Sequence, residues 1–235
     1  MNGTPALDKL PTSALAMYRS IMVIGALCAL MIVTVFNATE ARIARNREQA
    51  LAAAVNAVLP EARVTVPVAL DAAGALHTAD VLPALPVFLG YDADNQLVGA
   101  AITGIGMGYQ DNIRVLYAYS FERQAIIGFK VLESKETPGL GDRVETEAHF
   151  IANFEALDAQ LDATGNSLAN AIVPVKQGEK NNPWEVDGIT GATITSFAIG
   201  NILNDSASEW VPVLEANRQV FAQAPAQEGN RGAGE

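Results

Sequence analysis

Residues 87–132, VFLGYDADNQLVGAAITGIGMGYQDNIRVLYAYSFERQAIIGFKVL, hold most of the strand-like sequence of this chain. Runs rich in Val, Ile, Leu, Tyr and Phe alternate here with turn residues, which predicts successive strands joined by short turns. The predicted strands are residues 87–91, 97–103, 113–120 and 125–132, with a glycine-rich turn at 104–109. Strands joined by hairpin turns pair antiparallel, so the sequence predicts an antiparallel sheet.

Helical patterns lie on both sides of these strands. The predicted helices, in which apolar residues recur at helical spacing, are residues 40–59, 146–157 and 194–221. Pro212 should kink or split the last of them. A further strand is predicted at 169–175, and residues 60–86 should be irregular with one or two short strands. Strands gathered in mid-chain with helices around them are typical of an α+β fold rather than a doubly wound one.

A strongly apolar run precedes the folded part of the chain. Residues 21–36 carry no charge, and with their flanking apolar residues they approach the roughly 20 residues that span a bilayer. A cleaved signal peptide is the alternative, but its apolar region is usually about 7–15 residues. Phe36 also stands where a small residue should precede the cleavage site. Positive charges lie on both sides of the run, so they leave its orientation open.

The predicted organisation follows from these patterns. It is an N-terminal tail at 1–13, a transmembrane helix at 14–36, a helical stalk at 37–60, one folded domain at 61–221 and a disordered tail at 222–235. The formal net charge is -11, and residues 1–36 contribute +1 (Lys9 and Arg19 against Asp8), so the remainder carries -12. Such an acidic domain repels nucleic acid, which is therefore excluded as a partner.

The residue inventory restricts the chemistry. Cys28 is the single cysteine and lies within the apolar run, while His77 and His149 stand in no metal-ligand spacing and are interpreted as surface or helix-face residues. We therefore expect no disulfide, no cysteine-held cluster and no metal site. A Ser-His-Asp or paired-carboxylate arrangement is not evident either. Either the chain uses an organic cofactor, or it performs no chemistry.

One motif has the character of a phosphate site. It reads DGITGAT, residues 187–193, and runs directly into a predicted helix. Gly191 and Ala192 leave backbone N–H groups uncovered where that helix begins, and a helix N-terminus favours anions. Three hydroxyls, those of Thr190, Thr193 and Thr195, lie on or beside it. The alternative is an ordinary helix cap, for which threonine is also suited.

A second motif, ETPGLGD at residues 136–142, follows the last predicted strand of the central sheet. Pro138 and Gly139 favour a type II turn, which demands a positive φ at Gly139. Two glycines would also let the backbone approach a flat ligand closely. The alternative is a surface loop with no ligand.

The two motifs in this order, after one apolar segment, resemble the FMN-binding domain family, and most closely the G subunits of the Rnf electron transport complex. The resemblance implies that Thr193 receives FMN as a phosphoester from a flavin transferase, which reads Asp187. It implies that Thr190, Gly191 and Ala192 surround the attachment point. The residues that it places near the isoalloxazine ring are Glu136, Thr137, Gly139 and Leu140.

The resemblance also implies a role. The chain would be an electron-transfer subunit of a membrane-bound ion-translocating oxidoreductase, anchored once in the bacterial inner membrane with its domain in the periplasm. Its partners would be the other subunits of the complex, and it would show no turnover alone. Two alternatives remain: the covalent-FMN subunit of a sodium-pumping NADH:quinone oxidoreductase, or a non-redox binding module whose Thr-Gly-Ala-Thr is only a helix cap.

Overall fold

The computed structural model describes residues 14–71, 75–79 and 81–223. The predicted tail at 1–13 and all but two residues of the tail at 222–235 lie outside these residues. The chain divides into two compact units, Met1–Gln49 and Ala50–Glu235, and helix α1 (Ala14–Val58) contributes to both.

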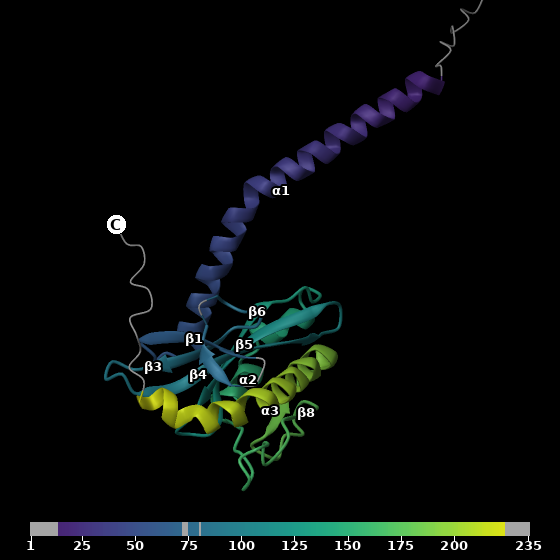
Figure 1. The fold of residues 1–235 in the computed structure, drawn as a ribbon. Coiled ribbons are helices and arrows are strands. Elements are labelled where there is room, and N and C mark those ends of the chain that lie inside the picture. The colour runs from purple at the N-terminus through teal and green to yellow at the C-terminus, as the bar shows by residue number, and fades with distance from the viewer. Residues whose placement is uncertain (1–13, 72–74, 80, 224–235) are drawn as a thin grey trace, which may run out of the picture. The chain divides into compact units, whose positions relative to one another are not determined.

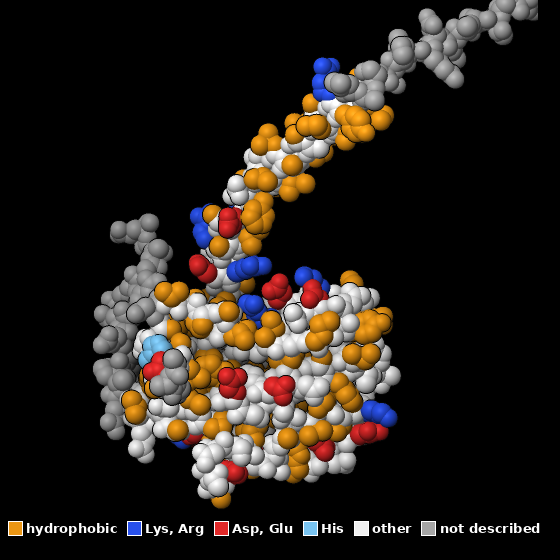
Figure 2. Space-filling view, turned by 45° about the vertical axis from the view of Figure 1, so that its right-hand side comes forward, with side chains coloured by type: hydrophobic (Ala, Val, Ile, Leu, Met, Phe, Trp, Pro, Cys, Tyr) orange, Lys and Arg blue, Asp and Glu red, His pale blue; other side chains and the backbone are white. Residues whose placement is uncertain are grey.

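The first unit is the apolar part of α1. It is long and apolar enough to cross a membrane, with a mean hydropathy of 2.4 over its best 18 residues and none of that window buried. Figure 2 shows hydrophobic side chains along it. The hydroxyls of Ser20 and Thr34 donate to the carbonyls of Ala16 and Leu30, one turn earlier. Because these hydroxyls are satisfied within the helix, they cost little in an apolar environment.

The second unit is built on a seven-stranded antiparallel sheet with the order β2-β1-β3-β4-β5-β6-β7 (Figure 1). The strands are β1 (Val64–Leu70), β2 (Leu76–Thr78), β3 (Val87–Tyr91), β4 (Leu97–Met107), β5 (Asn112–Ser120), β6 (Ala125–Glu133) and β7 (Leu157–Asp158). Strands β8 (Val173–Val175) and β9 (Glu185–Asp187) form a separate parallel pair. The predicted α+β fold with an antiparallel sheet is confirmed.

Three sequence predictions are wrong in detail. The predicted turn at 104–109 is mostly the end of β4, and the predicted strand at 169–175 is limited to β8. The predicted helix at 146–157 is instead α2 (Ala148–Ile151), the 3-10 helix η2 (Ala152–Glu155) and then β7. Its spacing misled because Phe150, Phe154 and Leu157 enter the core together from these three short elements. Another 3-10 helix, η1 (Gly141–Glu145), precedes them.

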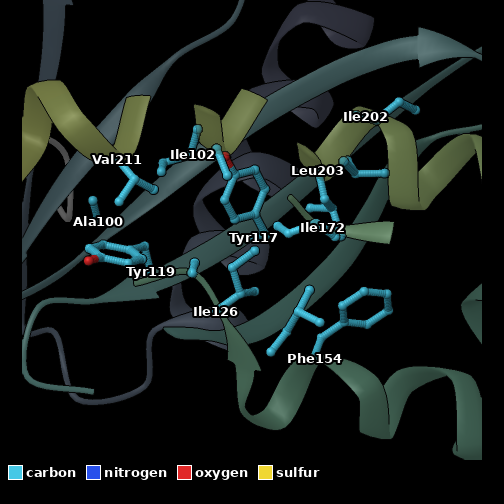
Figure 3. Packing of buried hydrophobic residues seen from close by; sticks show 14 of the residues in the cluster. Ala100, Ile102, Tyr117, Tyr119, Ile126, Phe154, Ile172, Ile202, Leu203 and Val211 are labelled. Carbon is cyan, nitrogen blue, oxygen red and sulfur yellow. The ribbon is translucent and has the colours of Figure 1, made fainter. Parts of the chain in front are cut away.

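Helix α3 (Thr193–Gln223) covers one face of the sheet (Figure 1). It remains one helix through Pro212. The core side chains between α3 and the sheet include Ile202, Leu203 and Val211 from the helix and Ala100, Ile102, Tyr117 and Tyr119 from β4 and β5 (Figure 3). The Tyr119 hydroxyl donates to Glu215 of α3 at 2.8 Å. Burial and this carboxylate both raise the pKa of Tyr119, so the hydroxyl stays protonated as a donor.

The last turns of α1 cover the opposite face. Ala54, Val55 and Val58 are buried there in a second apolar cluster with Phe88, Ala101, Leu116 and Ala118 of the sheet. Gly128 of β6 makes this contact possible, because a Cβ at that position would lie 2.4 Å from the Val58 carbonyl oxygen and 2.9 Å from its Cα. The end of α1 therefore lies directly on the backbone of the sheet.

Gly128→Ala should lower the free energy of unfolding by about 1–3 kcal/mol, because the added methyl group meets helix backbone rather than a movable side chain. Denaturant unfolding of the detergent-purified protein measures this change. Gly25→Ala is the matched control, since its added Cβ meets no heavy atom within 4 Å apart from its chain neighbours and the backbone of its own helix. Equal stability of the two variants would show that the end of α1 does not depend on this contact.

Candidate functional site

The two sequence motifs meet at one open cleft of about 340 Å³. This volume lies within the range of small-ligand sites, about 300–1,000 Å³. The cleft is formed by the turn after β4, the loop that follows β6 and the first turn of α3. Its lining residues are Tyr109, Glu136, Thr137, Leu140, Gly141, Gly191, Ala192, Thr193, Ile194 and Thr195.

The N-terminus of α3 opens onto this cleft. Gly191 has a φ of +87°, a left-handed conformation that glycine adopts without strain. The first hydrogen bond of the helix runs from the Ser196 amide to the Ala192 carbonyl at 2.9 Å. The amides of Thr193, Ile194 and Thr195 therefore have no partner within the helix. Three such N–H groups at the positive end of a helix of 31 residues make a site for an anion.

The preceding segment contrasts with those free amides. Every backbone N–H and C=O of residues 187–190 has a hydrogen-bond partner. The donors and acceptors that satisfy these eight groups are the side chains of Arg143, His149, Asn153, Gln177, Thr193 and Ser196 and the backbones of Val175 and Ala192. The segment is therefore held in one conformation up to Thr190, and the unpaired amides begin after it.

The three candidate hydroxyls differ in their access to the cleft. Thr195 is buried, and its Oγ1 donates to Oε2 of Glu136 at 2.7 Å. Thr193 is exposed and lines the cleft, and its Oγ1 donates to the Ile189 carbonyl over a longer 3.3 Å. Thr190 is exposed but is not among the lining residues. Of the three, Thr193 combines exposure with a position on the cleft wall.

Glu136 is the buried acidic side chain of the cleft wall. Besides the bond from Thr195, its Oε1 accepts from the Gln110 amide at 3.0 Å. Two glycines pack against it, because a Cβ on Gly108 or Gly141 would lie 2.5 Å or 2.6 Å from a carboxylate oxygen. The second glycine of the PGLG sequence is thus required by this contact. Glu136 thereby joins three segments of the cleft.

The loop itself is a tight turn. The Leu140 amide donates to the Thr137 carbonyl at 3.1 Å across Pro138 and Gly139, and Gly139 has a φ of +78°. This geometry agrees with the type II turn that the sequence predicts. Gly139 is not among the lining residues, whereas Thr137 is, and its Oγ1 accepts from the Gln110 side chain at 2.8 Å.

Exposed apolar side chains surround the opening of the cleft. Tyr109, Leu140 and Ile194 are 61%, 53% and 58% exposed, although each is large and hydrophobic. They belong to three different segments of the cleft. Tyr109, in the turn after β4, and Ile194, directly after the DGITGAT motif, are not part of the predicted site. An aromatic ring and two aliphatic side chains offer the surface on which a flat aromatic ligand packs.

Asp187 lies outside the cleft lining. Its Oδ1 accepts from the Gly178 amide at 2.7 Å, and its own backbone exchanges two hydrogen bonds of 3.0 Å with the Asn153 side chain. Lys180 also donates to Asn153, and burial lowers the pKa of this lysine despite the nearby Asp187 and Glu185 charges. The carboxylate of Asp187 therefore has a structural partner of its own.

Sequence reasoning missed the side chains that hold residues 187–190. Arg143 donates to the Thr190 carbonyl at 2.8 Å, and His149 Nε2 lies 3.3 Å from the Gly188 carbonyl. His149 is thus more than the surface or helix-face residue expected from the sequence. No local pattern marks such contacts, because their partners are 39 and 47 residues away. Within the described ranges, no three His, Cys, Asp or Glu side chains are grouped closely enough to hold a metal ion.

G subunits of ion-translocating oxidoreductase complexes are among the relatives that resemble this chain over half of its length or more. The G subunit of the ion-translocating oxidoreductase complex of Methanosarcina acetivorans is 28% identical over 196 residues, which are 83% of this chain and 93% of that protein. The G subunit of the Na(+)-translocating ferredoxin:NAD(+) oxidoreductase complex of Acetobacterium woodii is 33% identical over 123 residues, 52% of this chain and 53% of the relative. This second match therefore spans about half of each protein.

Solved structures share the fold. NqrC of Shewanella oneidensis superimposes with a TM-score of 0.55 at 18% identity, covering 77% of this chain and all of that one. The C subunit of the Na(+)-translocating NADH-quinone reductase from Parabacteroides distasonis gives 0.53 at 22% identity, covering 65% of this chain and 78% of that chain. A family model described as FMN-binding domain matches residues 108–208, a range that contains every residue of the cleft lining. These residues are therefore similar to the FMN-binding domain family.

Proposed function

We propose that this chain is the electron-transfer subunit of a membrane-bound ion-translocating oxidoreductase complex and carries FMN esterified through its phosphate to Thr193. The family match and the two G-subunit relatives support the redox role. Bound flavin supplies one- and two-electron chemistry that no side chain provides. The residues of this chain bind and orient the cofactor, and catalytic turnover belongs to the whole complex.

The observation that carries the proposal is the change in backbone hydrogen bonding at Thr193. Before it, residues 187–190 have all their backbone groups paired; from it onward, three consecutive amides lack a partner within the helix. The exposed Thr193 hydroxyl lies at this boundary, on the cleft wall. A phosphate esterified there would lie beside the free amides, so the residues present fit the group.

The attachment step needs only this hydroxyl and an activated flavin nucleotide presented by a flavin transferase. A bond forms between Thr193 Oγ1 and the flavin phosphorus, and the hydroxyl proton passes to a base of the transferase or to water. The bond from phosphorus to the activating group breaks, and that group leaves with the bonding electron pair. Thr195 does not compete, because it is buried and donates its proton to Glu136. Attachment replaces a binding equilibrium with permanent occupancy, so the cleft itself need not bind flavin tightly.

The cleft wall suits a flat ring system. Tyr109, Leu140 and Ile194 offer apolar surface around the opening, and their burial by a ligand would be favourable. Glu136 and Thr137 are already hydrogen-bonded to Thr195 and Gln110, so they hold the shape of the wall. We infer that the loop at 136–141 lies beside the isoalloxazine and that Thr190, Gly191 and Ala192 surround the phosphate.

The apolar part of α1 supports a single membrane anchor. We infer that the FMN domain faces the periplasm, outside a bacterial inner membrane, where a covalent cofactor cannot be lost by dilution. The other subunits of the complex are then its electron donors and acceptors. A quinone-reductase complex is the alternative assembly. NqrC shares the fold of this chain, but a likeness at 18% identity shows the fold and does not choose between the two complexes.

Thr193→Ala should abolish the flavin that remains after denaturation, because no other hydroxyl stands at that position. Loss of an exposed threonine at a helix start costs about 1 kcal/mol, so the domain should still fold. The measurement is fluorescence of the band on a denaturing gel, with thermal unfolding beside it. Thr190→Ala is the control and should retain the flavin. A fluorescent Thr193→Ala band would refute the assignment, whereas a dark wild-type band would favour a non-redox module.

Two substitutions of Asp187 distinguish recognition by the transferase from a structural role. Asp187→Asn keeps an oxygen that can accept from the Gly178 amide but removes the charge, whereas Asp187→Ala removes both. If the transferase reads the carboxylate, both variants should contain less flavin in cells. Only Asp187→Ala should also lose about 1 kcal/mol of stability. Flavin content and unfolding free energy are measured together, and normal loading of Asp187→Asn would show that the residue acts only through Gly178.

Gly139→Val should shift the absorption spectrum and midpoint potential of the flavin while leaving its attachment intact. A β-branched residue is strained at the φ of +78°, by about 1–3 kcal/mol, so the loop should move. Gly165→Val is the control, since Gly165 has a φ of +73° and equally open surroundings outside the cleft. A redox titration compares them. Identical potentials in both variants would mean that the ring lies away from residues 136–141.

A further inference from the structure

We propose that Arg143 is a positioning residue. It fixes the attachment segment, residues 187–191 before Thr193, against the loop at 136–141, and so determines how readily Thr193 receives the flavin. The inference rests on the proposed function. Arg143 lies in η1, directly after the loop, and its backbone amide contacts the Leu140 carbonyl at 3.3 Å. Its side chain reaches the other motif, where Nη1 donates to the Thr190 carbonyl at 2.8 Å.

The Thr190 carbonyl lies within the turn that the Ala192 amide closes on the Ile189 carbonyl at 3.0 Å. Gly191 follows it with a φ of +87°, and a Cβ built on Gly191 would lie 3.5 Å from Nη1 of Arg143. Glycine visits positive and negative φ with similar ease, so one closing hydrogen bond leaves this turn free to fluctuate. The guanidinium adds a second constraint at the Thr190 carbonyl. Without it, the turn should open more often, and Thr193, which follows directly, should be held less firmly.

The guanidinium is itself held in place. Its Nε and Nη2 donate to the same carboxylate oxygen of Glu147, at 3.1 Å and 2.9 Å. The Arg143 side chain is 34% exposed, so the ion pair by itself contributes little stability. Its use is orientation, because a planar guanidinium fixed on one edge presents its remaining donor in one direction. Removing Arg143 should therefore disturb the attachment segment more than the stability of the domain.

A second arginine provides a matched control. Arg218 Nη1 donates to the Phe121 carbonyl at 3.2 Å, and the same atom lies 3.7 Å from Glu215, three residues earlier in α3. Its side chain is 43% exposed. Arg218 thus makes the same kind of contact, a donor to a backbone carbonyl backed by a nearby glutamate. Neither Arg218 nor Phe121 lines the cleft.

The experiment compares Arg143→Met with Arg218→Met in the full-length protein in detergent. Methionine keeps an apolar stem and removes the donors. Hydrogen exchange is followed at the amides of Thr190, Ala192 and Ser196, which are paired in the structure. We expect about tenfold faster exchange at these amides in Arg143→Met only, as for the loss of one net hydrogen bond. Flavin per chain, measured on protein from cells that express the transferase, should fall severalfold in the same variant.

Arg143→Lys restores a charged donor and should recover part of both properties, and it serves as the test if Arg143→Met does not fold. Wild-type exchange rates in Arg143→Met, or rates equal to those of Arg218→Met, would overturn the inference. Fast exchange with normal flavin content would overturn it too, because the contact would then not govern loading. A wild-type protein without denaturation-resistant flavin would refute the proposed function instead, while the exchange data would still report whether Arg143 holds the turn.

Discussion

The cleft depends on one hydrogen bond between a buried carboxylate and a buried hydroxyl, from Thr195 Oγ1 to Glu136 Oε2 at 2.7 Å. It joins the first turn of α3 to the loop after β6, segments that lie 59 residues apart in the chain. The other oxygen of Glu136 accepts from Gln110, which brings in the turn after β4. A buried carboxylate is costly unless it is hydrogen-bonded, so the three segments stabilise one another through it.

The same first turn of α3 divides into two faces with different tasks. Buried Ser196 and Thr195 point their hydroxyls into the protein, where Ser196 accepts from the Ile189 amide and Thr195 reaches Glu136. Thr193 and Ile194 face the cleft and are exposed. The 3.6-residue period of the helix separates these faces. The first turn of α3 thus has one buried face that holds it in place and one exposed face that a ligand can contact.

Much of this could be predicted from local sequence. Strands β3 to β6 agree closely with the predicted runs, because apolar residues and turn residues alternate there. The exception is the end of β4, where Gly104 and Gly106 suggest a turn. Both are strand residues that leave room for Ile202 of α3, which a Cβ at either position would approach to 2.8 Å or 2.5 Å. The two motifs could also be found from local sequence, by their glycine and threonine residues. The roles of Arg143 and Asn153 could not, since single long-range contacts to backbone leave no local pattern.

The burial of Thr195 bears on how specifically the chain can be modified. Three threonines stand within six residues, and their hydroxyls are chemically equivalent in an unfolded peptide. In the folded domain Thr195 is buried and bonded to Glu136, and Thr190 is not among the lining residues, so Thr193 is the one of the three that is both exposed and part of the cleft wall. If the proposed attachment takes place on the folded domain, the fold itself selects Thr193, and the modifying enzyme has no need to distinguish one threonine from another.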